Sequence, residues 1–328
     1  MMRLPAFRYL APQRIDDAVR MLAEAGPTGS LVAGGTDLYP NMKRLQVSPS
    51  IVVGLSGVRE LSGLSFDGGA LIIGAGTTLT QLIRDSRVQS EFGPLVEAAL
   101  AISTPLLRNM GTVGGNLCLD TRCHFLNQSA FWRQAVGSCM KAESDICLVA
   151  PGGSRCWAIT SADLPPLLIA LGATVRLISS RGERELRLED LYRNDGIDYL
   201  RRARDEILTE IRVPALEGKR AGYLKLRRRG TFDFPALGVA AALELDESRI
   251  CRSARIVLGA VGPRPLLVPE AAEMVGQVVD RDLIKGLAEK IRSQHKPMHL
   301  ADYTHSYRRQ MIAINSRRLL AQLTGVDA

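Results

Sequence analysis

The chain has 328 residues, six cysteines and a formal net charge of +8, with a pI near 9.4. This length predicts about two domains and enough apolar core to fold without disulfides. No apolar run reaches the roughly 18 residues of a membrane helix, and the start lacks the apolar core of a signal peptide, so we expect a cytoplasmic protein without membrane contact. Its arginines are dispersed, so solubility or an acidic partner subunit explains the charge better than nucleic-acid binding.

The first segment with clear periodicity, IDDAVRMLAEAG, predicts a helix from Ile15 that Gly26 ends. The next segment, LVAGGTDL at 31–38, places two glycines and a threonine directly after apolar strand residues. Such a chain can present bare backbone N–H groups to a phosphate. A Gly-Gly pair alone is weak evidence because most such pairs are turns. Asp37 could cap a following helix instead of contacting a ligand.

A second glycine-rich stretch, TPLLRNMGTVGGN, follows at 104–116 and predicts a second loop that contacts the same large ligand. Neither stretch matches the G-x-G-x-x-G dinucleotide fingerprint or the phosphate loop of nucleotide triphosphatases. Between them, IVVGL and LIIGAGTT read as strands and LTQLIRDSRV as a helix, an alternation typical of an α+β domain.

Five of the six cysteines follow within a short stretch, with the spacing C-x4-C-x15-C-x7-C-x8-C from Cys118 to Cys156. Such a concentration in a chain of this length indicates a metal or redox centre. Zinc sites usually contain short C-x2-4-C pairs, which are missing here, whereas an iron-sulfur cluster can be held by cysteines on a long loop. Zinc and unligated buried thiols remain open alternatives at this point.

The last third of the chain predicts strands followed by helices. VPALEGKR reads as a linker, AGYLKLRRR, ALGVAAALEL and ARIVLGAVG as strands of a small sheet, and the tail from Pro269 as two or three helices. No Ser-His-Asp set or metal-binding His pair is evident, so hydrolytic chemistry has no support.

Taken together, five segments resemble the flavoprotein (medium) subunits and domains of the xanthine oxidase family of molybdenum hydroxylases. They are AGGTDL at 33–38, GTVGGN at 111–116, ADLPPLLIALGATV at 162–175, DEILTEIRVP at 205–214 and YLKLRRRGTFDFPALGVAAAL at 223–243. The resemblance implies an α+β fold. A two-part, vanillyl-alcohol-oxidase-like FAD-binding domain would occupy 1–216, and a small α+β domain of the CO dehydrogenase flavoprotein type would occupy 217–328.

The resemblance also implies a set of FAD contacts, residue by residue. Residues 31–38 would wrap the pyrophosphate, residues 112–116 would form the second arm, and Asp163 would bind an adenosine or ribose hydroxyl, since a carboxylate would repel a phosphate. Lys225 could stabilise reduced flavin, although a solvated lysine is the alternative. The full set is Leu31, Val32, Ala33, Gly34, Gly35, Thr36, Asp37, Leu38, Ile102, Thr112, Val113, Gly114, Gly115, Asn116, Asp163, Leu208 and Lys225.

One departure from the family pattern locates the cysteines. Asn116 and Asp163 normally lie about ten residues apart, but here 47 positions separate them, and an insertion at about 117–160 holds the cysteine stretch. The insertion resembles that of a reductase branch of the family, which carries an additional 4Fe-4S cluster. By this resemblance the ligands are Cys123, Cys139, Cys147 and Cys156. Cys118 and Cys251 are then structural, and His124 is not a ligand.

The function implied is that of an electron-transfer flavoprotein subunit with no catalytic residue of its own. Its partners would be a large molybdenum-cofactor subunit and a small 2Fe-2S subunit, arranged as a dimer of heterotrimers, with ferredoxin as electron donor. The substrate chemistry would be the reductive dehydroxylation of an aromatic thioester on the large subunit. Two alternatives are a flavin subunit of an oxidatively running hydroxylase and a cluster-bearing scaffold or assembly protein without flavin turnover.

Overall fold

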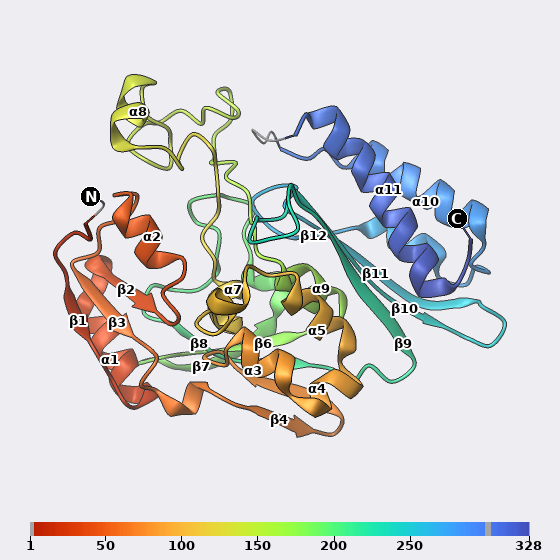
Figure 1. Ribbon diagram of the computed structural model, residues 1–328, viewed down its shortest axis with the longest axis horizontal. Coiled ribbons are helices and arrows are strands. Elements are labelled where there is room, and N and C mark those ends of the chain that lie inside the picture. The colour runs from red at the N-terminus through yellow and green to blue at the C-terminus, as the bar shows by residue number, and fades with distance from the viewer. Residues whose placement is uncertain (1–2, 299–302, 328) are drawn as a thin grey trace.

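A computed structural model describes residues 3–298 and 303–327, in which helices surround three β-sheets (Figure 1). The first sheet is parallel, with strand order β1-β3-β2. The helix α1 (Ile15–Ala25) covers it with Ala18, Val19 and Leu22, as the apolar periodicity predicts, and Gly26 ends the helix with a φ of +55°. The strands of this sheet are β1 (Arg8–Leu10), β2 (Gly29–Val32) and β3 (Ile51–Gly54).

The second sheet is antiparallel, with strand order β4-β5-β8-β6-β7, and carries the largest apolar core. The predicted single helix at 79–88 is two helices, because the Asp85 side chain accepts the N–H groups of Arg87 and Val88 and so begins a new helix. The strands are β4 (Leu64–Asp67), β5 (Ala70–Gly74), β6 (Thr174–Ser179), β7 (Gly182–Arg187) and β8 (Ile207–Val213). The helices at this core are α3 (Leu79–Arg84), α4 (Ser86–Glu91), α5 (Gly93–Leu100) and α9 (Leu164–Ala170).

The third sheet is antiparallel, with strand order β12-β11-β10-β9. The helix α9 packs on one face of this sheet and α11 (His305–Thr324) packs on the other (Figure 1). Because β10 is therefore covered on both faces, it reads as a continuous apolar run without alternation. The other elements are β9 (Lys219–Leu226), β10 (Leu237–Leu245), β11 (Cys251–Gly259), β12 (Leu266–Leu267), a 3-10 helix (Pro269–Met274) and α10 (Arg281–Gln294).

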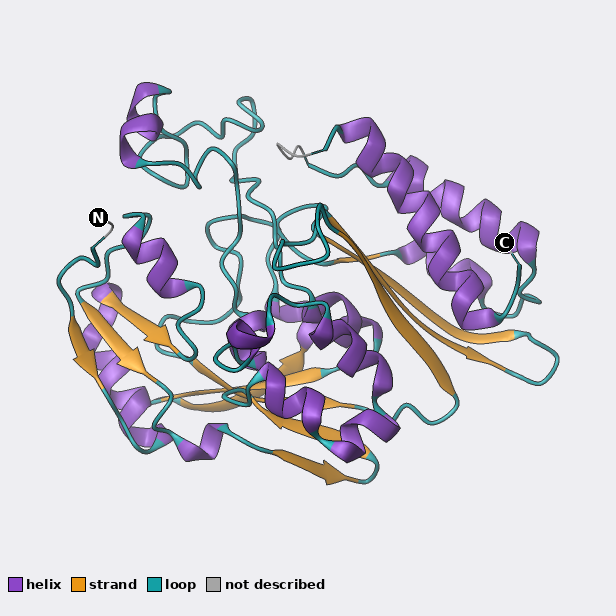
Figure 2. Cartoon of the chain, in the orientation of Figure 1, coloured by secondary structure: helices purple, strands orange, loops and turns teal. Residues whose placement is uncertain are grey.

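The cysteine-rich insertion extends away from this body and is mostly loop (Figure 2). Its regular element is α8 (Ala130–Ala135), which Ser129 caps by accepting the N–H of Trp132. The two ends of the insertion come together where Arg122 and Ile159 form an antiparallel bridge, with both N···O distances at 2.7 Å. Within the residues that the structure describes, no helix is long and apolar enough to cross a membrane.

Candidate functional site

The two glycine-rich stretches predicted to share one ligand lie against each other. Gly34 follows β2, and a Cβ atom placed on it would lie 1.8 Å from the carbonyl oxygen of Met110 in the second stretch. Gly35 adopts a φ of +71°, which favours glycine. Only a bare backbone fits between the stretches at Gly34, so this glycine is required by close approach.

The second stretch differs in form from the predicted loop. Most of it is helical, because Pro105–Arg108 forms α6 and Val113–Leu117 forms the short helix α7. Thr112 begins α7 by accepting the N–H of Gly115 at 3.0 Å. A Cβ atom on Gly114 would lie 2.6 Å from that of Ala75, so this glycine lets α7 approach the second sheet. The amide oxygen of Asn116 accepts the N–H of Leu164 at 3.2 Å and so joins α7 to α9.

A buried polar network joins the two domains at Asp163. One carboxylate oxygen accepts the hydroxyl of Tyr223 at 2.8 Å, and the other accepts Lys225 Nζ at 2.9 Å. Lys225 also donates to the carbonyl of Ala101 at 3.0 Å. The side chains of Asp163 and Lys225 are each only 4% exposed, so the alternative of a solvated lysine is wrong.

Burial opposes both charges in this pair. It raises the pKa of the Asp163 carboxyl, against the attraction of Lys225, and it lowers the pKa of the Lys225 ammonium, against the attraction of Asp163. Each oxygen of a carboxylate can accept more than one hydrogen bond, so Asp163 retains capacity for a further donor such as a hydroxyl. This arrangement is compatible with the predicted ribose or adenosine contact.

The remaining two predicted FAD contacts lie in the protein core. Leu208 is buried in β8, and Ile102 is buried in the segment between α5 and α6. The carbonyl of Ile102 accepts Arg108 Nη1 at 2.7 Å, and Ser103 beside it has a φ of +52°. Arg108 therefore fixes the turn that precedes the second glycine stretch. Sequence reasoning missed Arg108 and Tyr223, because their roles come from neighbours that lie six and 60 positions away.

Asp37 does not cap α2 (Leu38–Lys43) with its side chain, although it stands at the N-cap position. Its carboxylate instead pairs with Arg122 of the insertion and accepts Asn41 Nδ2 at 3.2 Å. The capping alternative is wrong because the buried guanidinium of Arg122 competes for the carboxylate. Burial lowers the pKa of Arg122 to about 10.

All four predicted cluster cysteines lie in the insertion with free thiols, and three are almost fully buried. Cys139, Cys147 and Cys156 are 7%, 4% and 5% exposed, and Cys123 is partly exposed. Burial raises the pKa of Cys156 to about 11 and also raises that of Cys123. Electrostatic interaction with Cys147 adds to both increases in pKa.

Backbone N–H groups act against the effect of burial at two of these thiols. The N–H of Ala158 donates to Cys156 Sγ at 3.4 Å, and the N–H groups of Phe125 and Leu126 lower the pKa of Cys123. Hydrogen bonds to sulfur also tune iron-sulfur clusters. No three His, Cys, Asp or Glu residues among those described are gathered closely enough to hold a metal ion. A single zinc ion would place its thiolates about 4 Å apart, whereas a four-iron cube spaces its ligands more widely.

Other residues of the insertion have different environments. The ring of His124 lies 4.0 Å from that of Phe125. Phe131 on α8 is 82% exposed. Cys118 packs against the large core and Cys251 is fully buried in β11, as expected for structural cysteines.

Lys141 fastens the base of the insertion to the body. Its ammonium donates to the side chains of Asp120 and Thr121, both at 2.6 Å, and to the carbonyl of Gly196 at 2.9 Å. It also lies 5.6 Å from the ring centroid of Tyr199. A largely buried cation therefore links the insertion to Gly196 of the body.

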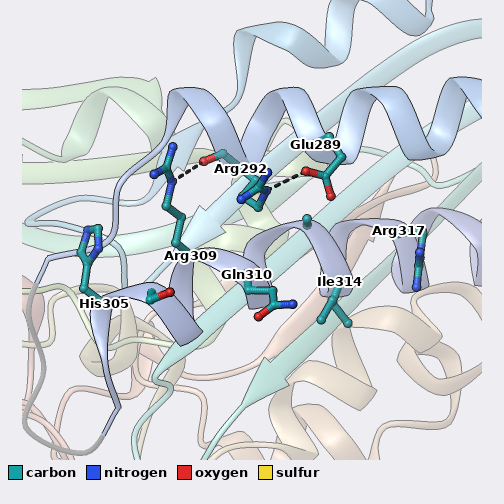
Figure 3. Close-up of a pocket in the computed structure, with 9 residues that line it drawn as sticks. Glu289, Arg292, His305, Arg309, Gln310, Ile314 and Arg317 are labelled. Atoms are coloured by element: carbon teal, nitrogen blue, oxygen red, sulfur yellow. Dashed lines mark hydrogen bonds and ion pairs between the residues drawn. The ribbon is translucent and has the colours of Figure 1, made fainter.

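A cavity of about 700 Å³ lies between the C-terminal helices α10 and α11 (Figure 3). Its rim includes Arg292, which pairs with Glu289, and Arg309, which donates to the carbonyl of Arg292 at 3.0 Å. No predicted FAD contact and no cysteine lines it. We therefore place the candidate flavin site at the glycine stretches, where the predicted residues meet.

Replacing Gly34 by alanine should weaken FAD binding. The added methyl group would force the two glycine stretches apart, and overpacking of this kind costs about 1 to 3 kcal/mol. This range corresponds to an increase in Kd of about fivefold to about 150-fold. Flavin fluorescence titration of the apoprotein measures the change. Gly286→Ala, in α10 with open space around it, is the matched control and should leave the Kd unchanged. An unchanged Kd for Gly34→Ala would show that Gly34 does not contribute to the flavin site.

The fold and site define a two-domain α+β protein, in which two glycine stretches meet beside a buried polar network. Comparison with known proteins identifies the class. Residues 5–216 match the FAD binding domain in molybdopterin dehydrogenase, and residues 221–323 match the CO dehydrogenase flavoprotein C-terminal domain. The chain belongs to this family of FAD-binding medium subunits of molybdenum hydroxylases, which confirms the predicted fold class.

Relatives match over almost the entire chain. The carbon monoxide dehydrogenase medium chain of Afipia carboxidovorans is 29% identical over 95% of both chains. The glyceraldehyde dehydrogenase medium chain of Sulfolobus acidocaldarius is 25% identical over 94% of this chain and 95% of the relative. A crystal structure of Cu,Mo-CO dehydrogenase is similar with a TM-score of 0.82, 26% identity and 99% coverage of each chain. The chain is therefore an FAD-binding oxidoreductase subunit of the kind found in multi-subunit molybdenum hydroxylases.

Proposed function

We propose that this chain is the FAD- and 4Fe-4S-carrying subunit of a 4-hydroxybenzoyl-CoA reductase. The observation that carries the proposal is the insertion within the flavin domain, with its four free thiols, three of them buried. Family membership supplies the FAD part. Sequence resemblance of the insertion supplies the cluster and the identity of the reductase.

The donor set favours an iron-sulfur cluster over the alternatives. Thiolate is the usual ligand of such clusters, and four cysteines on one loop match its four irons. Backbone N–H groups already point at Cys123 and Cys156, which is how a protein stabilises charge on cluster sulfurs. Lys141 adds positive charge near Cys156 and lowers the pKa of that thiol against the effect of burial.

The proposed chemistry takes place on a partner subunit. There, 4-hydroxybenzoyl-CoA would take up two electrons and two protons, losing its phenolic hydroxyl as water to give benzoyl-CoA. When bound, FAD and the cluster would supply a route for electrons from reduced ferredoxin toward the molybdenum cofactor. The residues of this chain would bind the phosphates at Gly34 and Gly114 and a hydroxyl of the nucleotide at Asp163, while Lys225 holds that carboxylate.

The assembly follows from the same proposal. A large molybdenum-cofactor subunit and a small 2Fe-2S subunit would join this chain in a dimer of heterotrimers. Relatives such as the medium chain of Afipia carboxidovorans are by name one of several chains. The proposed location is the cytoplasm, where reduced ferredoxin is available.

The purified three-subunit complex tests the reductase assignment. With a strong one-electron donor and full cofactor content, it should convert 4-hydroxybenzoyl-CoA to benzoyl-CoA, measured by chromatography of the thioesters. A complex with full FAD and iron that fails to reduce this substrate would contradict the assignment. Oxidation of an aromatic heterocycle by that complex would favour an oxidatively running hydroxylase, and a preparation without FAD would favour a scaffold protein.

A further inference from the structure

The segment 37–46, which contains α2, contacts the cysteine insertion at several points. Arg122, directly before Cys123, pairs with Asp37 and donates to Asn41 Oδ1 at 3.3 Å. Gln46 Nε2 donates to the carbonyl of Leu126 at 3.2 Å, and Arg133 Nη2 donates to the carbonyl of Leu45 at 3.3 Å. These contacts join segments 80 to 88 positions apart in the sequence.

Arg122 is the most buried of these links. Its side chain is 13% exposed and that of Asp37 is 24% exposed, so the pair is shielded from solvent far more than an ordinary surface salt bridge. The guanidinium also lies 4.7 Å from the ring centroid of Phe234. Asp37, Asn41 and the ring together fix the orientation of a side chain whose backbone closes the insertion against Ile159.

The link connects two candidate ligand sites through very few bonds. Asp37 belongs to the segment predicted to wrap the pyrophosphate, two positions after Gly35. Arg122 is the residue before Cys123, the first predicted cluster ligand. A ligand that fixes the position of Asp37 would therefore also fix the side chain of Arg122. Because the backbone of Arg122 pairs with Ile159, the backbone at Cys123 would be fixed as well.

We propose that Arg122 is a positioning residue that couples the flavin site to the cysteine site, so that FAD and the metal cluster each strengthen binding of the other. This inference rests on the proposed cluster. Coupling of this kind is reciprocal, because the free energy by which one ligand helps the second equals that by which the second helps the first. Arg122 pairs with Asp37 of the glycine segment and directly precedes Cys123, so it connects the two sites.

The structure separates this coupling role from a purely structural one. Lys141 links the insertion to the body separately from Arg122, through its hydrogen bond to the carbonyl of Gly196. Loss of Arg122 should therefore remove the contacts with Asp37 and Asn41. The hydrogen bonds of Leu45, Gln46 and Lys141 should keep the insertion in place. Arg155 offers a matched control, because it also directly precedes a predicted ligand, Cys156, but lies over the ring of Trp157 at 4.0 Å.

Titration of FAD into apoflavoprotein, followed by flavin fluorescence, tests the coupling in four forms. These are the native chain and Arg122→Met, each with iron loaded and with iron removed by a chelator. In the native chain, iron loading should lower the Kd for FAD by at least about fivefold, the lower end of typical coupling. In Arg122→Met the two values should be equal, and in Arg155→Met the native ratio should persist. Arg122→Lys keeps the positive charge but lacks the planar guanidinium group, so the ratio of the two Kd values should be intermediate.

Failure of the coupling and failure of the cluster proposal give different results. A native ratio in Arg122→Met, or loss of the ratio in Arg155→Met as well, would overturn the inference while leaving the cluster in place. If the chain takes up no iron, the cluster proposal fails by itself, and proteolysis then decides the link. FAD should protect the insertion from trypsin in the native chain and in Arg155→Met, but not in Arg122→Met. Equal protection in all three would overturn the link itself.

Discussion

Cys139→Ser should abolish the iron content of the anaerobically purified protein while leaving one FAD bound. Native protein should contain four irons and four acid-labile sulfides per chain, as one 4Fe-4S cluster requires. Cys139 is buried, and its carbonyl accepts the N–H groups of Ala142, Glu143 and Ser144, so the backbone turn stays in place when sulfur is replaced by oxygen. Only the ligand changes, and a hydroxyl is a poor ligand for iron-sulfur clusters.

Iron, sulfide and flavin analysis with EPR after reduction measures the result. Cys251→Ser is the control, because Cys251 is equally buried but lies in β11 of the C-terminal domain, where its thiol donates to the carbonyl of Ser253 at 3.3 Å. That variant should keep all four irons. Zinc in the native protein, or full iron in Cys139→Ser, would contradict the ligand assignment and return the chain to the flavin subunits that carry FAD alone.

Local patterns predicted much of the fold because each rests on neighbouring residues. The periodicity of IDDAVRMLAEAG predicts α1 and its end at Gly26, and the apolar runs IVVGL and LIIGAGTT predict β3 and β5. The helix expected at 79–88 failed because Asp85 satisfies the first N–H groups of α4, an interaction that helical periodicity does not encode.

The candidate site was harder to predict, because its polar contacts join distant segments. Glycine spacing located the two stretches, but the carbonyl of Met110 against Gly34 depends on how the strands are packed. For Asp37 the sequence left a helix cap open as an alternative, since nothing near it in the sequence indicates the guanidinium of Arg122, 85 positions later. For Lys225 the sequence left a solvated lysine open as an alternative, and the position of α9 against β9 buries it beside Asp163.

Lys225→Met should destabilise the protein strongly, by about 3 to 5 kcal/mol, because it leaves the buried carboxylate of Asp163 without its cation. Burial already raises the pKa of Asp163, so loss of the Lys225 ammonium should raise this pKa further and favour the neutral carboxyl. In a neutral carboxyl, the protonated oxygen no longer accepts a hydrogen bond from a ribose hydroxyl. We therefore expect FAD affinity to fall together with stability, measured by urea unfolding of the apoprotein and by flavin titration.

The double variant Asp163→Asn with Lys225→Met separates the two effects. Removing both charges avoids an uncompensated buried ion, so its stability should recover by at least about 1 kcal/mol relative to Lys225→Met alone. FAD affinity should not recover, because an amide donates where the carboxylate accepted. Tyr223→Phe, which removes only the hydrogen bond to the other oxygen of Asp163, should cost about 1 kcal/mol. If the double variant were no more stable than Lys225→Met, the lysine would act through packing of its aliphatic stem, and the charge argument would be wrong.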